Sequence, residues 1–283
     1  MKKIIAMLLV LTMVLPLVAC GGGSNDSGVK TVTPGKLTVA LSPDFAPMEF
    51  VDPTKEGQDK FVGFDVSMAK YFAEQMGKEL VIQPMSFDAC QTAVYTGSVD
   101  MAISGFSWTE SRAENYNISD YYHAGENESN QILITLADNG DKFADVGTGA
   151  GLKVGAQTAS LQESLVMEQL PDAELVTIGD LGTAILQLKN GDFDVLAVAE
   201  GNGEAIIASN PEVAKSGYYF AVDEKYTANV VLLQKGADEL TAKVNELIAK
   251  AEGEGLNEIW YAEAQAIAGI DVSFDDEGNE ITG

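Results

Sequence analysis

The chain has 283 residues, enough for two ordinary domains with a sizeable core, and 46% of them are hydrophobic. It is strongly acidic, because 43 Asp and Glu residues stand against 17 Lys and Arg residues, for a formal net charge of -26. This charge argues against a nucleic-acid partner, which needs a basic face, and against tight binding of the folded body to an anionic membrane. We interpret the acidity as a source of solubility.

The first twenty residues are typical of a targeting signal. Two lysines precede an apolar run over residues 4–18, and a site of small residues follows. The sequence LVAC at residues 17–20 resembles the lipobox of bacterial lipoproteins. This resemblance implies that residues 1–19 are a cleaved signal peptide and that acylated Cys20 anchors the protein at the extracytoplasmic face of the bacterial cell membrane. An ordinary signal peptide with an incidental cysteine is the alternative. Residues 20–35 are rich in glycine after the cysteine and are predicted to form a flexible linker.

Cysteine and histidine are scarce in this chain. With Cys20 acylated, Cys90 has no partner for a disulfide, so the fold must depend on its hydrophobic core. We expect Cys90 to be a buried thiol on a helix face. His123 is the only histidine, and a metal site needs more His and Cys than this chain has. We therefore expect neither a metal ion nor another cofactor.

Strands and helices alternate in the first part of the chain after the linker. In its first helix, Asp65 is predicted to be the N-cap and Gly77 to follow the last turn. Residues 52–60 are polar and rich in turn formers, so we expect an exposed hairpin loop there. The β-α-β-α-β order favours a mostly parallel sheet. The expected strands are residues 36–41, 80–83 and 97–104, and the expected helices are residues 64–76 and 87–96.

The rest of the chain continues this alternation after a turn-like segment at residues 117–125. Ser160 and Glu163 form a capping box for a helix that begins near Leu161. Residues 271–283 are acidic and are expected to be a tail or a terminal hairpin. The expected strands are residues 131–135, 153–156, 174–178, 193–199 and 229–233, and the further helices are residues 181–189, 238–251 and 257–268.

Two segments repeat one local pattern. Gly97-Ser98-Val99-Asp100 and Gly191-Asp192-Phe193-Asp194 each stand between a helix and a buried strand. Aligning the glycines pairs Gly105 with Ala199. The simplest interpretation is two β/α lobes of similar plan that present their strand ends to a shared cleft. A chance similarity of two helix-turn-strand units is the alternative.

The segment 97–112 predicts an anion site. Its expected strand ends in a turn of small residues, in which Ser104, Gly105 and Ser107 offer hydroxyl and backbone N–H groups at a helix start. Arg112 follows one turn into that helix, and a guanidinium fits a carboxylate in a bidentate way. We therefore predict the carboxylate clamp of a small-molecule binding protein. A surface ion pair of the arginine with a nearby glutamate is the alternative.

Four motifs in order resemble one family. They are FAP at residues 45–47, FVGFD at residues 61–65, GFSWTESR at residues 105–112 and VGAQ at residues 154–157. Behind a lipobox, they resemble family 3 of the extracellular solute-binding proteins, the substrate receptors of bacterial polar amino-acid ABC transporters. The resemblance covers nearly the whole chain after the linker.

The resemblance implies an α/β protein with a two-lobed periplasmic-binding-protein-like fold of type II. Each lobe would be a mostly parallel sheet flanked by helices, and two crossovers would form a hinge that lets the lobes close around a ligand. The crossovers would lie near residues 121–125 and 224–228. Lobe 1 would comprise residues 36–121 and 226–270, and lobe 2 residues 126–222.

The resemblance also implies roles for cleft residues. Two aromatic residues would cover the ligand from opposite sides, with plain core packing as the alternative. Backbone groups at the turn would meet the ammonium and carboxylate of the ligand, and a hydroxyl with an arginine would bind the carboxylate. From lobe 2, a helix start would also bind the carboxylate and one side chain would reach the variable group. In that order these residues are Phe45 and Phe87, Ser104 and Gly105, Ser107 and Arg112, Ser160 and Leu161, and Gln157. Ser42, Trp108 and Glu200 complete the predicted ligand-binding set, with Trp108 either a ligand wall or part of the packing between lobes.

One position departs from the pattern of the family. The family usually holds the α-ammonium of its ligand with an Asp five residues after the position of Asp194, where this chain has Ala199 followed by Glu200. Either Glu200 reaches back to that place, or Asn202 or Glu204 substitutes, or the ligand has no α-ammonium there.

These features predict a monomeric, lipid-anchored extracytoplasmic receptor without enzymatic activity. It would bind a small carboxylate-bearing solute, most simply an amino acid, between two closing lobes and deliver it to an ABC permease. A cleft enzyme of dehydratase type on the same fold is one alternative, with Glu200 as its candidate acid or base. A sensory ligand-binding subunit is the other.

Overall fold

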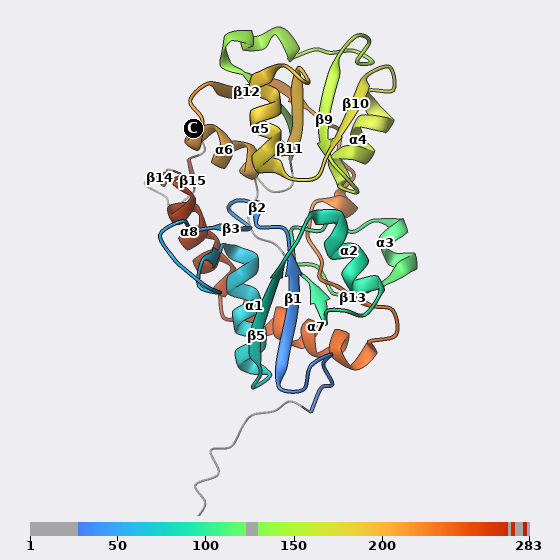
Figure 1. The fold of residues 1–283 in the computed structure, drawn as a ribbon, viewed down its shortest axis with the longest axis vertical. Helices are drawn as coiled ribbons and strands as arrows, with labels where there is room; N and C mark the ends of the chain where they lie inside the picture. The colour runs from blue at the N-terminus through green and yellow to red at the C-terminus, as the bar shows by residue number, and fades with distance from the viewer. Residues whose placement is uncertain (1–27, 123–129, 271–272, 275–279, 282–283) are drawn as a thin grey trace, which may run out of the picture.

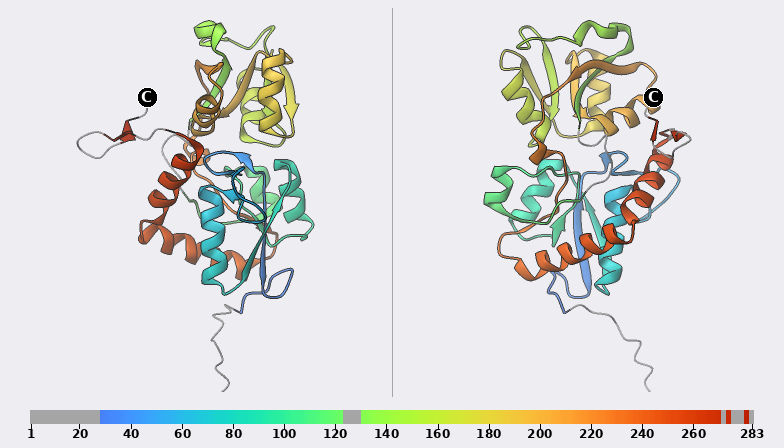
Figure 2. Two further views of the ribbon diagram at one scale, coloured as in Figure 1. Left: turned by 60° about the vertical axis from the view of Figure 1, so that its left-hand side comes forward. Right: turned by 180° about the vertical axis from the view of Figure 1, so that it is seen from behind.

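The computed structural model describes residues 28–122, 130–270, 273–274 and 280–281, and these residues form two lobes (Figure 1). Each lobe is built on one five-stranded sheet that carries helices on both faces, and Figure 2 shows the two lobes from two further sides. The predicted fold class, a two-lobed α/β protein with mostly parallel sheets, is confirmed. The expected signal peptide and Cys20 lie outside the described residues.

The sheet of lobe 1 has the strand order β5, β1, β6, β13, β7. β1 runs parallel to β5 and β6, whereas β13 comes from late in the chain and runs antiparallel to β6 and β7. β6 is much shorter than the strand expected there. The turn-like segment expected from residue 117 begins later, because residues 117–118 belong to an edge strand. In sheet order the strands span Glu79–Pro84, Lys36–Leu41, Met101–Ala102, Leu232–Gln234 and Tyr116–Ile118.

Helices cover both faces of this sheet because successive side chains of β1 point to opposite sides. Val39 packs in one cluster with Phe72 of α1 and with apolar residues of α7 and α8. Ala40 packs in a second cluster with Phe87 and Cys90 of α2. Cys90 is fully buried, as predicted. The helices of lobe 1 are α1 (Phe64–Gln75), α2 (Phe87–Tyr95), α3 (Glu110–Asn115), α7 (Asp238–Gly253) and α8 (Leu256–Ala268).

The sheet of lobe 2 has the order β10, β9, β11, β8, β12, with β9 parallel to β10 and β11 and with β8 antiparallel to both of its neighbours. α4 packs on one face and α5 and α6 pack on the other. The strands span Glu174–Ile178, Lys153–Gln157, Val195–Ala199, Gln131–Leu136 and Val213–Tyr219 in sheet order. The helices are η2 (Ala137–Phe143, a 3-10 helix), α4 (Leu161–Gln169), α5 (Leu181–Asn190) and α6 (Glu200–Ser209).

The repeated Gly-x-x-Asp pattern has the same structural role in both lobes. The N–H of Asp100 donates to the carbonyl of Thr38 at 3.0 Å, and its carboxylate accepts the N–H of Thr38 at 2.7 Å. Asp194 makes the same two bonds with Lys153, each at 2.9 Å. Thr38 lies in β1 and Lys153 in β9. Asp100 directly precedes β6, and Asp194 directly precedes β11, so each Asp fixes the start of its own strand to the parallel strand beside it. The pattern therefore marks a shared plan and not a chance similarity.

The chain passes between the lobes after β7 and again after β12. Tyr122 of the first passage and Asn229 of the second exchange backbone hydrogen bonds of 2.9 and 3.1 Å, so the two segments lie side by side. The second passage also contains the 3-10 helix η3 (Glu224–Tyr226). Gly125, expected in the first crossover, lies outside the described residues.

A small antiparallel sheet of lobe 1 lies at the border between the lobes (Figure 1). It consists of β2 (Asp44–Phe45), β3 (Glu49–Val51) and β4 (Phe61–Val62), and β2 contacts α5 of lobe 2. Residues 52–60 form a largely exposed loop between β3 and β4, as predicted. This sheet is the part of lobe 1 that carries side chains to the other lobe.

The start of α1 differs from the prediction. Its N-cap is Gly63, at φ 122°, and a Cβ there would lie 2.3 Å from the carbonyl oxygen of Met48, so the position requires glycine. Asp65 is therefore inside the first turn and fully buried, and the predicted N-cap role is wrong. At the other end of the helix, Gly77 has φ 65°, as expected for the residue that follows a helix cap.

The end of the chain pairs with itself. β14 (Ser273–Phe274) and β15 (Glu280–Ile281) are antiparallel, which is the hairpin alternative of the prediction. No described helix combines the length and the apolar character that crossing a bilayer requires.

Candidate functional site

The two lobes meet around a small, partly open cavity of about 20 Å³. Most of the predicted ligand-binding residues line it, together with three residues that were not predicted: Asp44, Glu49 and Gln162. The lining comprises Asp44, Phe45, Glu49, Phe87, Ser104, Gly105, Ser107 and Arg112 from lobe 1, and Gln157, Leu161 and Gln162 from lobe 2.

Arg112 is a buried cation at the edge of this cavity, with 4% of its surface exposed. Thr109 caps α3 by accepting the N–H of Arg112 at 3.2 Å, which fixes the backbone from which the guanidinium extends. The guanidinium lies over the rings of Phe87 and Phe106, 5.5 and 5.1 Å from their centroids. These rings stack on each other at 4.6 Å. The aromatic pair therefore holds the planar charge in a fixed orientation.

The polar partners of this guanidinium are neutral. Nη1 donates to the carbonyl of Ser107 at 2.6 Å, Nη2 to the carbonyl of Ala159 at 2.9 Å, and Nε to Oε1 of Gln91 at 3.3 Å. Burial lowers the pKa of Arg112 to about 10, so the group stays charged at neutral pH. Among the described side chains, no carboxylate pairs with it. The alternative of a surface ion pair is therefore wrong: Glu110 instead binds Nζ of Lys225 at 2.6 Å.

The turn before α3 depends on a glycine. Gly105 has φ 56°, and a Cβ on it would lie 2.9 Å from the ring of Phe45, so a side chain here would force that ring out of the cavity. Its N–H donates to a carboxylate oxygen of Asp65 at 2.7 Å. The turn is thus fastened to α1 from behind while its front faces the cavity.

Carboxyl groups gather behind and beside this turn. Glu49 is fully buried; the hydroxyl of Ser104 donates to its Oε1, and the carboxyl group is also a hydrogen-bonding neighbour of Asp65. Asp65 is also fully buried and accepts the Tyr122 hydroxyl at 3.2 Å. Asp44 lies nearer to lobe 2 and accepts the hydroxyl of Ser42 at 2.8 Å.

Burial disfavours the charged form of all three carboxyl groups. It raises the pKa of Asp65 to about 7 and that of Asp44 to about 6. It raises the pKa of Glu49 well above its ordinary value, with the nearby charge of Asp65 as the second cause. A cation placed among these groups would restore their ionised forms. Even so, the described residues contain no cluster of the kind that holds a metal ion.

The hairpin of β2 and β3 explains why Phe45 and Glu49 face the same way. The two residues are directly opposed across the hairpin, and opposed side chains lie on one face of a sheet. An aromatic wall and a carboxylate thus come from one cross-strand pair. Glu49 stands in the apolar run MEFV, and a charge enclosed in such a run is the sequence signal that could have marked it as buried.

Three predicted residues stand just outside the lining. Ser42 donates its N–H to the hydroxyl oxygen of Ser104 at 3.0 Å and so helps to position Ser104. Ser160 accepts the N–H of Glu163 at 3.1 Å as the N-cap of α4, which begins at Leu161 as predicted. Trp108 stacks on Tyr226 at 6.5 Å, so it packs beside the second crossover, the second of its two interpretations.

Glu200 is placed away from the cavity. It is the first residue of α6, and its carboxylate binds Nζ of Lys215 at 2.9 Å, the hydroxyl of Tyr219 at 2.8 Å and Nδ2 of Asn130 at 2.7 Å. Asn202 likewise does not line the cavity and donates to the carbonyl of Ala46 at 3.0 Å. The sequence predicted Glu200 as a cleft residue. Its side chain instead bonds to Lys215, Tyr219 and Asn130 within lobe 2.

The fold and this cavity define a two-lobed solute-binding protein. Residues 37–263 match the family described as bacterial extracellular solute-binding proteins, family 3. Because the match covers most of the chain, the chain belongs to this family, which confirms the predicted function class of an extracytoplasmic solute receptor.

Relatives and solved structures agree with this placement. The arginine-binding extracellular protein ArtP of Bacillus subtilis is 29% identical over 273 residues, which cover 92% of this chain and 98% of that protein. A probable histidine-binding protein of Campylobacter jejuni is 27% identical over 84% of this chain and 93% of its own length. The structure of the amino acid ABC transporter substrate-binding protein AbpA of Streptococcus pneumoniae, bound to L-arginine, superposes with a TM-score of 0.74. Its sequence is 31% identical, and the match covers 83% of this chain and 96% of that chain.

The buried Asp65 predicts a pH dependence of stability. A carboxyl whose pKa is raised by folding stabilises the folded state below its unfolded pKa, here about 3.8, and this contribution is lost as the pH rises through the folded pKa of about 7. Replacing the carboxyl by an amide removes this pH-dependent contribution to the free energy of unfolding. Relative to Asp65→Asn, the wild type should therefore lose about 1 kcal/mol or more of unfolding free energy between about pH 5 and about pH 8.

Urea unfolding of both proteins at the two pH values measures this difference. Asp59→Asn, in the exposed loop between β3 and β4, is the matched control and should track the wild type. An unchanged difference between wild type and Asp65→Asn across the range would contradict the raised pKa.

Proposed function

We propose that this protein is a lipid-anchored receptor that captures a basic amino acid between its lobes and delivers it, unchanged, to an ABC permease. The observation that carries the proposal is one cavity lined by a buried arginine, Arg112, and by two carboxylates, Asp44 and Glu49. The family supports the receptor role, and the charges of the cavity support the class of solute.

Arg112 would bind the carboxylate of the amino acid. A buried guanidinium whose described partners are neutral leaves its charge uncompensated, and a carboxylate matches its fork of donors. The hydroxyl of Ser107 and the N–H groups at the start of α4, near Leu161, would add donors from both lobes. Phe45 and Phe87 would enclose the body of the solute.

The net charge of the lining favours a basic side chain. When both carboxyl groups are ionised, they and the guanidinium sum to one negative charge, which an amino acid with two cationic groups and one carboxylate would neutralise. An amino acid with a neutral side chain would leave one carboxyl without a cation, and burial would then favour its protonated form. Relatives named as arginine-binding and histidine-binding proteins support the same class of solute.

The location and the partner follow from the predicted lipobox and from the family. Acylated Cys20 would hold the receptor at the extracytoplasmic face of the membrane, with residues 20–35 as a tether. A permease would contact both lobes when they are closed, and the receptor would act as a monomer.

Calorimetric titration tests the class of solute. L-arginine, L-lysine and L-histidine should bind more tightly than L-glutamine, and L-glutamate should bind weakest. Arg112→Lys should weaken L-arginine binding about tenfold through loss of the fork geometry, and Arg112→Ala should weaken it further. Glu200→Gln, which removes an acid outside the cavity, is the control and should stay within about threefold of wild type. Failure of the wild type to bind any basic amino acid would refute the proposal.

The same titration should depend on pH. The pKa of Asp44, which lines the cavity, is raised to about 6, so this carboxyl is mostly protonated at about pH 5 and ionised at about pH 8. Affinity for L-arginine should therefore rise about tenfold over this range, because an ionised carboxylate pairs with a cation and a protonated one does not. A constant affinity, with the protein folded throughout, would contradict this.

Fractionation tests the anchor. When the full chain is expressed in a bacterium that processes lipoproteins, the mature protein should sediment with membranes, and Cys20→Ser should release it or leave it as unprocessed precursor. Cys90→Ser, which replaces the other cysteine, is the matched control and should sediment like the wild type. Sedimentation with membranes of a Cys20→Ser protein that is processed to the mature size would rule out this anchor.

A further inference from the structure

All of the charged side chains that line the cavity come from lobe 1. Arg112 extends from α3, and Asp44 and Glu49 come from the hairpin of β2 and β3. The lining residues of lobe 2, Gln157, Leu161 and Gln162, are neutral. Lobe 2 therefore contributes no charged group to the lining. A charged residue of lobe 1 must distinguish a ligand with a cationic side chain from one with a neutral side chain.

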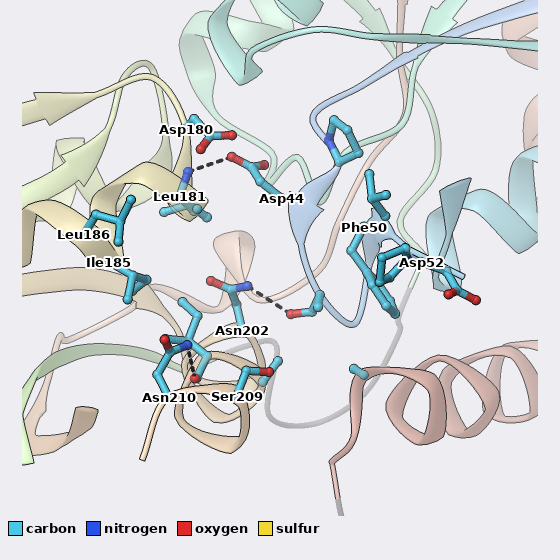
Figure 3. Close-up of a pocket in the computed structure, with 18 of the residues that line it drawn as sticks. Asp44, Phe50, Asp52, Asp180, Leu181, Ile185, Leu186, Asn202, Ser209 and Asn210 are labelled. Carbon is cyan, nitrogen blue, oxygen red and sulfur yellow. Dashed lines mark hydrogen bonds between the residues drawn. The ribbon is translucent and has the colours of Figure 1, made fainter. Parts of the chain in front are cut away.

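Asp44 is the acidic residue of the lining that also bonds to lobe 2. One of its oxygens, Oδ2, accepts the N–H of Leu181 at 2.7 Å (Figure 3). The same oxygen accepts Nε2 of Gln157 at 3.3 Å. Leu181 is the first residue of α5, so its N–H is one of the helix donors without a partner inside the helix. The positive end of the helix dipole favours an ionised acceptor at this place.

Asp44 also stands between two spaces. It lines the small cavity, and it lines a wider groove of about 540 Å³ that continues between the lobes past Asp180, Ile185 and Asn202 (Figure 3). A second bond between lobes crosses the same region, from Asn202 to the carbonyl of Ala46. A ligand side chain that extends from the cavity toward the groove would therefore contact the carboxylate of Asp44.

The environment of Asp44 acts on its ionisation in both directions. Ser42, Leu181 and Gln157 donate to the carboxylate oxygens, and the first two of these bonds lower the pKa. Burial and the nearby carboxyl of Asp180, which is also a hydrogen-bonding neighbour of Asp44, raise it. A cation beside the carboxylate would favour the ionised form.

We propose that Asp44 is a specificity-determining residue that couples the charge of the side chain of the ligand to closure of the lobes. A cationic side chain pairs with Asp44 and keeps it ionised, and the ionised carboxylate holds the start of α5 more strongly than a protonated one does. A neutral side chain gives no such support, so it stabilises the closed state less. This inference rests on the proposed binding of a basic amino acid.

A pair of matched ligands and one isosteric variant test the coupling. L-citrulline has the shape of L-arginine but carries a neutral ureido group in place of the guanidinium. Asp44→Asn keeps an oxygen for the Leu181 N–H but removes the charge. Calorimetry should show that Asp44→Asn weakens L-arginine binding at least tenfold and changes L-citrulline binding less than threefold. Small-angle scattering at saturating ligand should show compaction of the wild type by L-arginine and less compaction of Asp44→Asn.

A control variant separates the charge of Asp44 from acidity in general. Asp180 is the N-cap of α5 and lines the groove but not the cavity, so Asp180→Asn should keep the preference for L-arginine over L-citrulline. Equal weakening of both ligands by Asp44→Asn would mean that Asp44 only joins the lobes, and would overturn the proposal. Unchanged binding of both would overturn it as well. Absence of L-arginine binding by the wild type would instead refute the proposed function and, with it, this inference.

Discussion

A guanidinium and three carboxyl groups are buried within one region of this protein, and burying each of them costs free energy that only matched partners can offset. Arg112 has aromatic rings and carbonyl oxygens around it, but no described carboxylate. Glu49 and Asp65 are hydrogen-bonding neighbours of each other, and burial raises the pKa of both. The cleft therefore holds a buried cation and, apart from it, acidic groups that a bound cation would help to ionise.

The two lobes share a plan but differ in chemistry. Asp100 and Asp194 make the same bonds at corresponding places, so the backbones of the two sheets start alike. At the cleft, however, Gly105 of lobe 1 lies against Phe45 and is followed by Arg112, whereas the aligned Ala199 is followed by a glutamate that bonds within lobe 2. One lobe supplies the charges, and the other supplies a neutral surface and helix starts that close over them.

The hairpin of β2 and β3 links recognition to closure. It belongs to lobe 1, yet Asp44 and Ala46 accept hydrogen bonds from lobe 2, while the neighbouring Phe45 and Glu49 line the cavity. The same few residues therefore contact the space for the solute and the opposing lobe. Arg112 also lines the cavity and bonds to the opposing lobe, because its guanidinium donates to the carbonyl of Ala159 in lobe 2. Contacts of this kind let a bound solute change the balance between open and closed lobes.

The sequence alone was enough to predict the alternation of strands and helices, the two-lobed fold and the turn that ends in Arg112, because hydrophobic periodicity, capping residues and family motifs are local signals. It did not reveal the acids of the cleft. Asp65 stands two residues after Gly63 at the start of a helix, where capping is the usual role of an aspartate. Glu49 lies in a short strand, and its pairing with β2 decides which way its side chain faces. Glu200 was predicted in the cleft from its position, but Lys215, nearby in space and not in sequence, draws its carboxylate away. Burial and the direction of a charged side chain depend on which distant elements pack against it, so only the tertiary structure decided them.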